Sequence, residues 1–341
     1  MAYIPALDGI RAIAVMLVMA FHANTPWVSG GFLGVDVFFV LSGFLITSIL
    51  YAEIARTGRI DIRRFYVRRF ARLAPPLGAC LVLYLVAAPY AWPEYYHHMR
   101  DALLAAAYLS DYSTALWGMP EMLRHTWSLA AEEHFYLLWP LVLLLLRPLQ
   151  PRTVLLVLLA LYATGTAWRI ACLELHGWYL TYYRFDTRAT GMIAGAALAL
   201  AVRCGYAAHL GRAAPILCVT LGYLIAFSLY WRNPMALQAG VITAELTTAA
   251  TIVLIVQSGA PRWLGSPGLS YIGRLSYGLY LFHYPVMHYL RDEYDWPAAL
   301  VVGSAAALAL SAISYHTIEA WVRRCRGSAA HDQTGSAAPT V

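Results

Sequence analysis

Residues 30–47 read GGFLGVDVFFVLSGFLIT, a nearly continuous apolar stretch in which Asp36 is the only charged residue. A helix needs about 20 mainly apolar residues to cross the roughly 30 Å hydrocarbon core of a bilayer, and the apolar run over residues 32–51 is long enough. It is therefore predicted to be a transmembrane helix. Three glycines precede Asp36, and they favour close packing against a neighbouring helix because glycine lets two backbones approach.

Nine further apolar runs lie on both sides of this stretch, which makes ten predicted spans. These nine cover residues 9–24, 73–90, 131–147, 153–172, 187–202, 214–231, 236–257, 272–290 and 298–318. Of the 341 residues, 60% are hydrophobic and 12% are charged, whereas about 25% are charged in soluble domains. The composition excludes a soluble enzyme and predicts an all-α, polytopic membrane protein with about ten transmembrane helices.

Arginine determines the predicted orientation, because loops rich in basic residues stay in the cytoplasm. All 24 basic residues are arginines, and segment 52–72 carries seven of them. That segment and both termini are therefore expected to be cytoplasmic. Residues 97–118 mix alanine with aspartate, so an interfacial or re-entrant helix is expected there. Loop arginines also explain the net charge of +6, and no nucleic-acid partner is expected.

These features predict one transmembrane domain over residues 1–322 and a basic, disordered cytoplasmic end over residues 323–341. The expected location is the inner (plasma) membrane, in contact with lipids, and the oligomeric state stays open. No metal site is expected, because the cysteines lack metal-ligand spacing and the histidines form no recognisable cluster. The cysteines are predicted to be free thiols: Cys80, Cys172, Cys204, Cys218 and Cys325.

Ionisable side chains inside a span are costly, which makes each of them a candidate functional residue. The first span holds Asp8, Arg11 and His22. Arg11 and His22 are about three helical turns apart, so they share one face and are separated by roughly 16 Å along the axis. The alternative is that Arg11 extends to the lipid headgroups and that His22 only ends the helix.

The stretch YIPALDGIRAIAVMLVMAFH (residues 3–22) resembles the start of the acyltransferase 3 family of integral-membrane acyltransferases, with its arginine and histidine separated by ten residues. GGFLGVDVFFVLSGFLIT, RRFYVRRFARLAPP and WSLAAEEHFYLLWP are similar to the family's next motifs, and FDTRATGMIAGA, IGRLSYGLYLFHYPV and SYHTIE follow in family order. The resemblance covers about residues 4–320. The chain departs from it at His134, where glutamine is usual, and at Ala320, where Arg-Pro is frequent.

The resemblance implies an O-acyltransferase that moves an acyl group, in the first instance acetyl, from cytoplasmic acyl-CoA to a hydroxyl of an envelope glycan or lipid-linked saccharide. His22 is expected as the general base, because the pKa of histidine lies near neutrality. Arg11 is expected to position the donor, and Glu133 to orient His22 or contact the acceptor. Direct transfer and a covalent acyl-histidine both stay open, and no tightly bound cofactor is expected.

Arginine binds phosphate groups in a bidentate manner, and segment 52–72 places arginines on the side where acyl-CoA is made. The donor phosphates are expected at Arg68, Arg69 and Arg72, with the pantetheine arm passing Arg11. Positive-inside topology and binding of anionic lipids explain the same arginines without any substrate.

Further residues are expected to bind substrate near this route: Asp36, Trp127 and Ser128. Asp36 is expected to pair with Arg11 or His22, with a structural salt bridge as the alternative. The histidines of the last two spans are expected to be structural: His283, His288 and His316.

Two other functions fit the same residues. One is an acyltransferase of the same family that modifies a secondary-metabolite sugar such as that of a macrolide. The other is a proton-coupled transporter or flippase, although no inverted repeat is recognisable. Aromatic residues are abundant in the predicted outside segments, around residues 92–96 and 178–183, and such side chains stack on sugar rings, which favours a carbohydrate acceptor.

Overall fold

The computed structural model describes residues 3–207 and 209–325, and within these ranges the chain is helical with no strand. The α-helices are α1 (Pro5–His22), α2 (Gly34–Thr57), α3 (Ile62–Ala91), α4 (His98–Ala106), α5 (Ser110–Trp117), α6 (Trp127–Leu146), α7 (Pro151–Tyr182), α8 (Phe185–Arg188), α9 (Thr190–Arg203), α10 (Ala214–Tyr223), α11 (Val241–Ser258), α12 (Pro267–Glu293) and α13 (Trp296–Ser314). Most of the tail predicted to be disordered lies outside the described residues.

Eight helical stretches are long and apolar enough to cross a membrane, which confirms a multi-pass, all-α membrane protein. They are Pro5–His22, Gly31–Thr57, Ile62–Ala91, Arg124–Leu146, Pro151–Tyr182, Leu210–Ser228, Ala236–Ser258 and Trp296–Cys325. The two remaining predicted spans are also helical. One forms the 14-residue helix α9, which is short for a crossing, and the other lies within the 27-residue helix α12, which carries Arg274 and Arg291. The count of ten and the orientation stay predictions.

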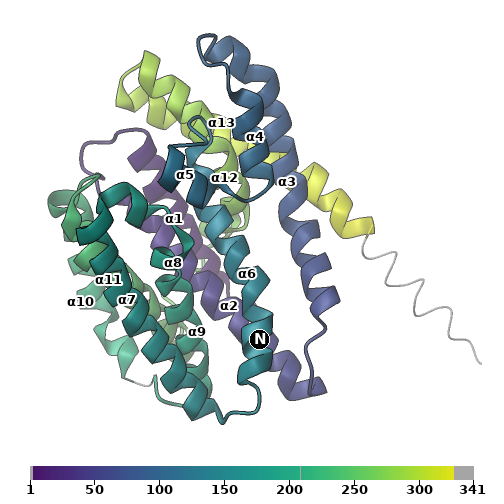
Figure 1. The fold of residues 1–341 in the computed structure, drawn as a ribbon, viewed down its shortest axis with the longest axis vertical. Helices are drawn as coiled ribbons and strands as arrows, with labels where there is room; N and C mark the ends of the chain where they lie inside the picture. The colour runs from purple at the N-terminus through teal and green to yellow at the C-terminus, as the bar shows by residue number, and fades with distance from the viewer. Residues whose placement is uncertain (1–2, 208, 326–341) are drawn as a thin grey trace, which may run out of the picture.

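Residues 97–118 form two short helices instead of a span. Helices α4 and α5 have nine and eight residues, or roughly 14 and 12 Å at 1.5 Å per residue. The chain turns between them, where Tyr108 has a positive φ of 54°. Neither helix is long enough to cross a bilayer, as expected, and both lie at one end of the bundle beside the end of α3 (Figure 1).

Helix α1 packs closely against α2 and α12. A Cβ atom on Gly31 or Gly34 would overlap the backbone carbonyl of Leu17 or Ala14 on α1, so the predicted close approach at these glycines is confirmed. Helix α12 lies along α1 in the same direction, with Gly273 against Asp8. Helix α1, which carries Asp8, Arg11 and His22, therefore lies close beside both α2 and α12.

The bundle has two chemically different ends. We call the end with the α2–α3 connection and the start of α1 the arginine-rich end, because segment 52–72 lies there. The opposite end, the His22 end, holds the end of α1, the helices α4 and α5 and the turn between α12 and α13 (Figure 1). All five cysteines are free thiols, as predicted.

Candidate active site

Two chambers meet inside the bundle. The inner chamber, of about 300 Å³, is lined by residues of α1, α2, α3, α6 and α12, among them Arg11, Arg69 and Glu132. The outer chamber, of about 420 Å³, is lined by His22 and lies at the His22 end. Val35 and Tyr280 line both chambers, so these two side chains form the partition between them.

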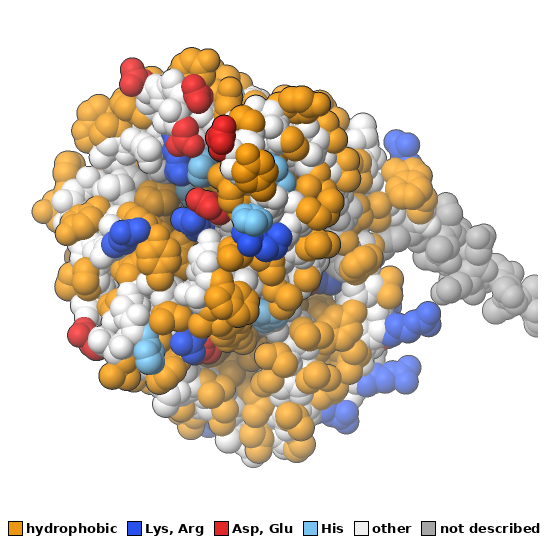
Figure 2. All heavy atoms as spheres, turned by 45° about the horizontal axis from the view of Figure 1, so that its top comes forward, with side chains coloured by type: hydrophobic (Ala, Val, Ile, Leu, Met, Phe, Trp, Pro, Cys, Tyr) orange, Lys and Arg blue, Asp and Glu red, His pale blue; other side chains and the backbone are white. Residues whose placement is uncertain are grey.

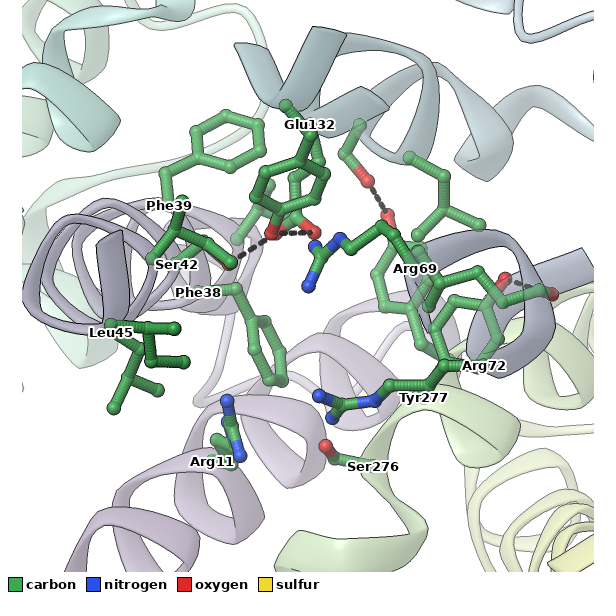
Figure 3. Close-up of a pocket in the computed structure, with 18 residues that line it drawn as sticks. Arg11, Phe38, Phe39, Ser42, Leu45, Arg69, Arg72, Glu132, Ser276 and Tyr277 are labelled. Carbon is green, nitrogen blue, oxygen red and sulfur yellow. Dashed lines mark hydrogen bonds between the residues drawn. The ribbon is translucent and has the colours of Figure 1, made fainter. Parts of the chain in front are cut away.

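The inner chamber continues to the arginine-rich end. Two further pockets share lining residues with it: one of about 450 Å³ that includes Arg11, Arg68 and Arg72, and one of about 630 Å³ that includes Arg68, Arg69 and Arg72. The guanidinium groups of Arg11, Arg69 and Arg72 point toward a common space (Figure 3). The structure thus brings together the four arginines expected on the donor route.

Arg11 is positioned by a neighbour one turn earlier on α1. Its Nη1 lies 3.1 Å from Oδ1 of Asp8, and the Tyr3 hydroxyl donates to the other carboxylate oxygen at 2.8 Å. Arg11 lines both the inner chamber and one of the end pockets. It therefore lies at the junction between them, with its charge partly balanced by Asp8.

Two neighbouring glutamates of α6 have different surroundings, and Glu132 lines the inner chamber. Glu132 accepts hydrogen bonds from the hydroxyls of Ser42 (3.1 Å) and Tyr136 (3.0 Å) (Figure 3). Oε1 of Glu133 lies 4.0 Å from Nε of Arg69, and the Arg69 guanidinium carbon lies 3.2 Å from the centroid of the Tyr136 ring. Glu133 is expected from the sequence to orient His22 or to contact the acceptor. Its ion pair is with Arg69 and not with His22, because this face of α6 is turned to α3, and contact with the acceptor stays a prediction.

Asp36 was expected to pair with Arg11 or His22, and this expectation is wrong. Its Oδ1 accepts from Nη2 of Arg188 at 2.8 Å, and both side chains are buried. The Arg188 guanidinium also lies over the Tyr182 ring, 4.7 Å from its centroid. The first turn of α2 faces the end of α8, which carries Arg188, as well as α1, so Asp36 forms the structural salt bridge that is the alternative expectation.

A second buried ion pair lies near the first. Nη1 of Arg169 on α7 is 3.7 Å from Oε1 of Glu245 on α11, and Thr190 hydrogen-bonds to both side chains. The Tyr162 hydroxyl donates to the other Glu245 oxygen at 2.8 Å. Together the two pairs join α2, α7, α8 and α11, and Thr190 at the start of α9 links to the second pair.

His22 meets a second histidine in the outer part of the bundle. Its Nδ1 lies 2.8 Å from Nε2 of His283 on α12, and the Tyr284 ring stands edge-on to it with centroids 4.8 Å apart. The sequence prediction had treated His283 as structural. The signal that could have found it is the LYLFHYPV motif, whose histidine lies at the same level of the bundle as His22 because α1 and α12 run side by side.

His125 also lines the outer chamber and is buried. Pro285 inside α12 has no N–H, so the Leu281 carbonyl one turn earlier is left without its helical partner. His125 Nε2 lies 3.2 Å from that carbonyl oxygen, and because a carbonyl only accepts, Nε2 carries the proton. Within the described chain, Nδ1 of His125 is buried with no hydrogen-bond partner.

The loop before His125 is held by Asp101 of α4. This buried carboxylate accepts from the backbone N–H groups of Glu121 and Met122, at 2.9 and 3.0 Å, and from the Tyr95 hydroxyl at 2.9 Å. Burial, and then the hydrogen bond to Asp101, raise the pKa of Tyr95 to about 12. The Tyr95 hydroxyl therefore stays a donor at neutral pH, and Asp101 sets the position from which α6 begins.

The predicted substrate residues Trp127 and Ser128 lie on different sides of the partition. Trp127 lines the outer chamber and Ser128 the inner one. The Tyr280 hydroxyl donates to the His125 carbonyl at 2.9 Å and lies 2.6 Å from the Ser128 hydroxyl, which fixes the partition. Figure 2, with the His22 end tilted toward the viewer, shows basic, acidic and histidine side chains among hydrophobic ones on this face. Aromatic rings line the chamber below: Phe21, Phe32, Trp127, Tyr182, Tyr183, Trp231 and Tyr284.

The chain is similar to known acetyltransferases over most of its length. It is 30% identical to the "Peptidoglycan O-acetyltransferase OatA" of Listeria monocytogenes and 32% identical to the "O-acetyltransferase OatA" of Staphylococcus aureus, over 94% of this chain and 56% and 57% of those proteins. It is also 32% identical to the "Putative peptidoglycan O-acetyltransferase YrhL" of Bacillus subtilis, over 94% of this chain and 55% of that protein. The chain thus spans little more than half the length of these relatives.

No solved structure matches the chain. The sequence profile of one family, described as "Acyltransferase domain", matches residues 4–316, a range that contains both chambers and every residue of the predicted site. The chain therefore belongs to the acyltransferase 3 family.

Proposed function

We propose that this protein transfers an acetyl group from acyl-CoA, bound at the arginine-rich end, to a hydroxyl group of an envelope glycan in the outer chamber. The observation that carries the proposal is the pair of chambers that meet at Val35 and Tyr280, with Arg11 on one side and His22 on the other. Because those two residues are roughly 16 Å apart along α1, the long pantetheine arm of the donor suits the distance.

The charges support a donor site at the arginine-rich end. Arg11, Arg68, Arg69 and Arg72 line the inner chamber or the pockets that continue from it, and arginine matches phosphate geometry. We propose that this end faces the cytoplasm of a bacterial inner membrane, where acyl-CoA is made, because basic loops stay inside.

In the proposed reaction His22 accepts a proton from the acceptor. As the acceptor hydroxyl oxygen bonds to the thioester carbonyl carbon, its proton passes to His22 and the carbon–sulfur bond breaks, so that CoA leaves as a thiolate and takes up the proton. In the covalent route a His22 ring nitrogen attacks the thioester carbonyl carbon, the carbon–sulfur bond breaks and CoA leaves as a thiolate. The acceptor hydroxyl oxygen then attacks the acyl carbon, the bond to His22 breaks, and the hydroxyl proton passes to the thiolate. Both routes need His22 and both have the same products.

The acceptor proposed first is a peptidoglycan-type glycan. The supporting observations are the aromatic walls of the outer chamber, which suit stacking on sugar rings, and the two relatives whose names include peptidoglycan. A secondary-metabolite sugar is the alternative acceptor, and transfer to a macrolide but not to muropeptides would select it.

The test uses the full chain in lipid nanodiscs with radiolabelled acetyl-CoA and muropeptide acceptors. His22→Ala is expected to reduce kcat by about 10²–10⁴-fold, the usual contribution of a general base. Arg11→Ala is expected mainly to raise KM for acetyl-CoA. The controls are His176→Ala and Arg262→Ala, which change exposed residues outside the chambers. Wild-type rates in both the His22 and the Arg11 variants would overturn the proposal.

A further inference from the structure

We propose that His283 is a positioning residue that sets which ring nitrogen of His22 carries the proton. This inference deepens the proposed function and rests on it, since it concerns the base that the reaction uses. It follows from a line of hydrogen bonds that begins at a backbone carbonyl on α12 and ends at His22 on α1.

The first hydrogen bond fixes the tautomer of His283. Its Nδ1 lies 2.9 Å from the carbonyl oxygen of Leu279, one turn earlier on α12. A carbonyl oxygen only accepts, so the proton of the neutral imidazole is on Nδ1. Nε2 of His283 is then a bare acceptor, and it is the atom that faces His22.

The second hydrogen bond fixes the tautomer of His22. Nδ1 of His22 lies 2.8 Å from Nε2 of His283. Because Nε2 of His283 accepts, Nδ1 of His22 donates, and the neutral His22 ring has its lone pair on Nε2. His22 lines the outer chamber, where a hydroxyl group of the acceptor would meet that lone pair.

The hydrogen-bond partner of His22 is the neutral side chain of His283, and a neutral group suits this buried location. His283 is fully buried, and a carboxylate in its place would have to be desolvated inside the membrane at a large cost. A backbone carbonyl on a helix orients the imidazole without adding a charge. The tautomer is set as it is in metal-binding and catalytic histidines that donate to a backbone carbonyl.

Other contacts from α12 hold His22 in the same orientation. The Tyr284 ring stands edge-on to the imidazole, and Nη1 of Arg291 lies 3.4 Å from the His22 carbonyl oxygen. One helix thus provides three neighbours of His22: His283, Tyr284 and Arg291. Residues of α12 thus contact the Nδ1 atom, the ring and the backbone carbonyl of His22, and together they orient its side chain.

The test compares glutamine and asparagine at position 283. The glutamine oxygen reaches the place of the histidine Nε2 atom and still accepts from His22, whereas the shorter asparagine side chain reaches only the place of Nδ1. His283→Gln is expected to reduce kcat less than tenfold. His283→Asn is expected to reduce it by about 10²-fold or more, at the lower end of the contribution of a general base. KM for acetyl-CoA is expected to change little in both, because the donor site lies in the other chamber.

A second measurement does not depend on activity. Nitrogen-15 NMR of histidine-labelled protein reports the tautomer of His22, with the signal assigned by its loss in His22→Ala. Wild-type protein and His283→Gln are expected to show a protonated Nδ1, and His283→Asn a mixture of tautomers. Equal activity of the glutamine and asparagine variants in folded, monodisperse protein, or a protonated Nε2 in the wild type, would refute the inference. Absence of acetyl transfer by the wild type would refute the proposed function alone.

Discussion

Single residues inside the bundle bring charges into a low-dielectric interior, and two buried arginines there each pair with a buried carboxylate. Arg188 pairs with Asp36, and Arg169 pairs with Glu245. The Arg188 guanidinium also lies over the rings of Tyr182 and Trp127, which line the outer chamber. The Asp36–Arg188 pair therefore supports the wall of the site without contacting either His22 or the arginines of the donor route.

Breaking this pair is expected to destabilise the fold. Arg188→Met leaves the Asp36 carboxylate buried without its partner, and removing one member of a buried pair costs about 3–5 kcal/mol. The double variant Asp36→Leu with Arg188→Met is expected to recover much of that loss, because no charge is left unpaired. Thermal unfolding in detergent measures the cycle. Additive losses in the double variant would contradict this account.

Tyr280 is the residue at the partition between the chambers. Tyr280→Ala removes a ring that lines both chambers, and it is expected to give water access to the donor thioester, since enclosed sites prevent such side reactions. The ratio of acetyl-CoA hydrolysis to transfer is expected to rise. Tyr280→Phe is the matched control, because it keeps the ring and removes only the hydroxyl contacts. An unchanged ratio in the alanine variant would exclude a role for the ring as a barrier.

Among the helices, the contact of α1 with α2 sets the orientation of the α1 face that carries Arg11 and His22. The glycines at the start of α2 let its backbone lie against α1, where a Cβ atom would overlap backbone carbonyl groups. Backbone atoms cannot move aside as a flexible side chain can. The face of α1 that carries Arg11 and His22 is thereby held toward α12 and the chambers.

A side chain at Gly34 is expected to separate these two helices. Gly34→Val places atoms on the Ala14 carbonyl, and overpacking of this kind costs about 1–3 kcal/mol or more. We expect lower yield of folded protein and a lower melting temperature. Gly222→Ala is the control, because a Cβ atom there meets nothing within 4 Å. Equal melting temperatures for Gly34→Val and the wild type would show that α1 and α2 are free to separate.

Over the whole molecule, the arrangement separates the two proposed substrate sites. Anion-binding side chains gather at the arginine-rich end, and aromatic and histidine side chains gather at the His22 end. The two groups belong to chambers that meet in the middle of the bundle. A membrane acyltransferase with its donor and acceptor on opposite sides needs such an arrangement, since neither substrate then has to cross the bilayer.

Much of this protein could be predicted from its sequence, because the signals are local. The length of each apolar run predicts a membrane helix, and ten such runs all prove helical. The spacing of Arg11 and His22 predicts that they share one face, since helical periodicity depends only on residue number. The family motifs predict the class of reaction, and the glycines before Asp36 predict the close helix contact.

The tertiary structure alone decided which charged and polar side chains meet. Asp36 pairs with Arg188, which is 152 residues away in the sequence, and His22 contacts His283, which is 261 residues away. No periodicity within one helix specifies such partners, because they depend on how the helices pack and rotate against one another. For the same reason the pairing of Glu133 with Arg69, and the two chambers that meet at Tyr280, follow from the packed bundle and not from any single segment of the sequence.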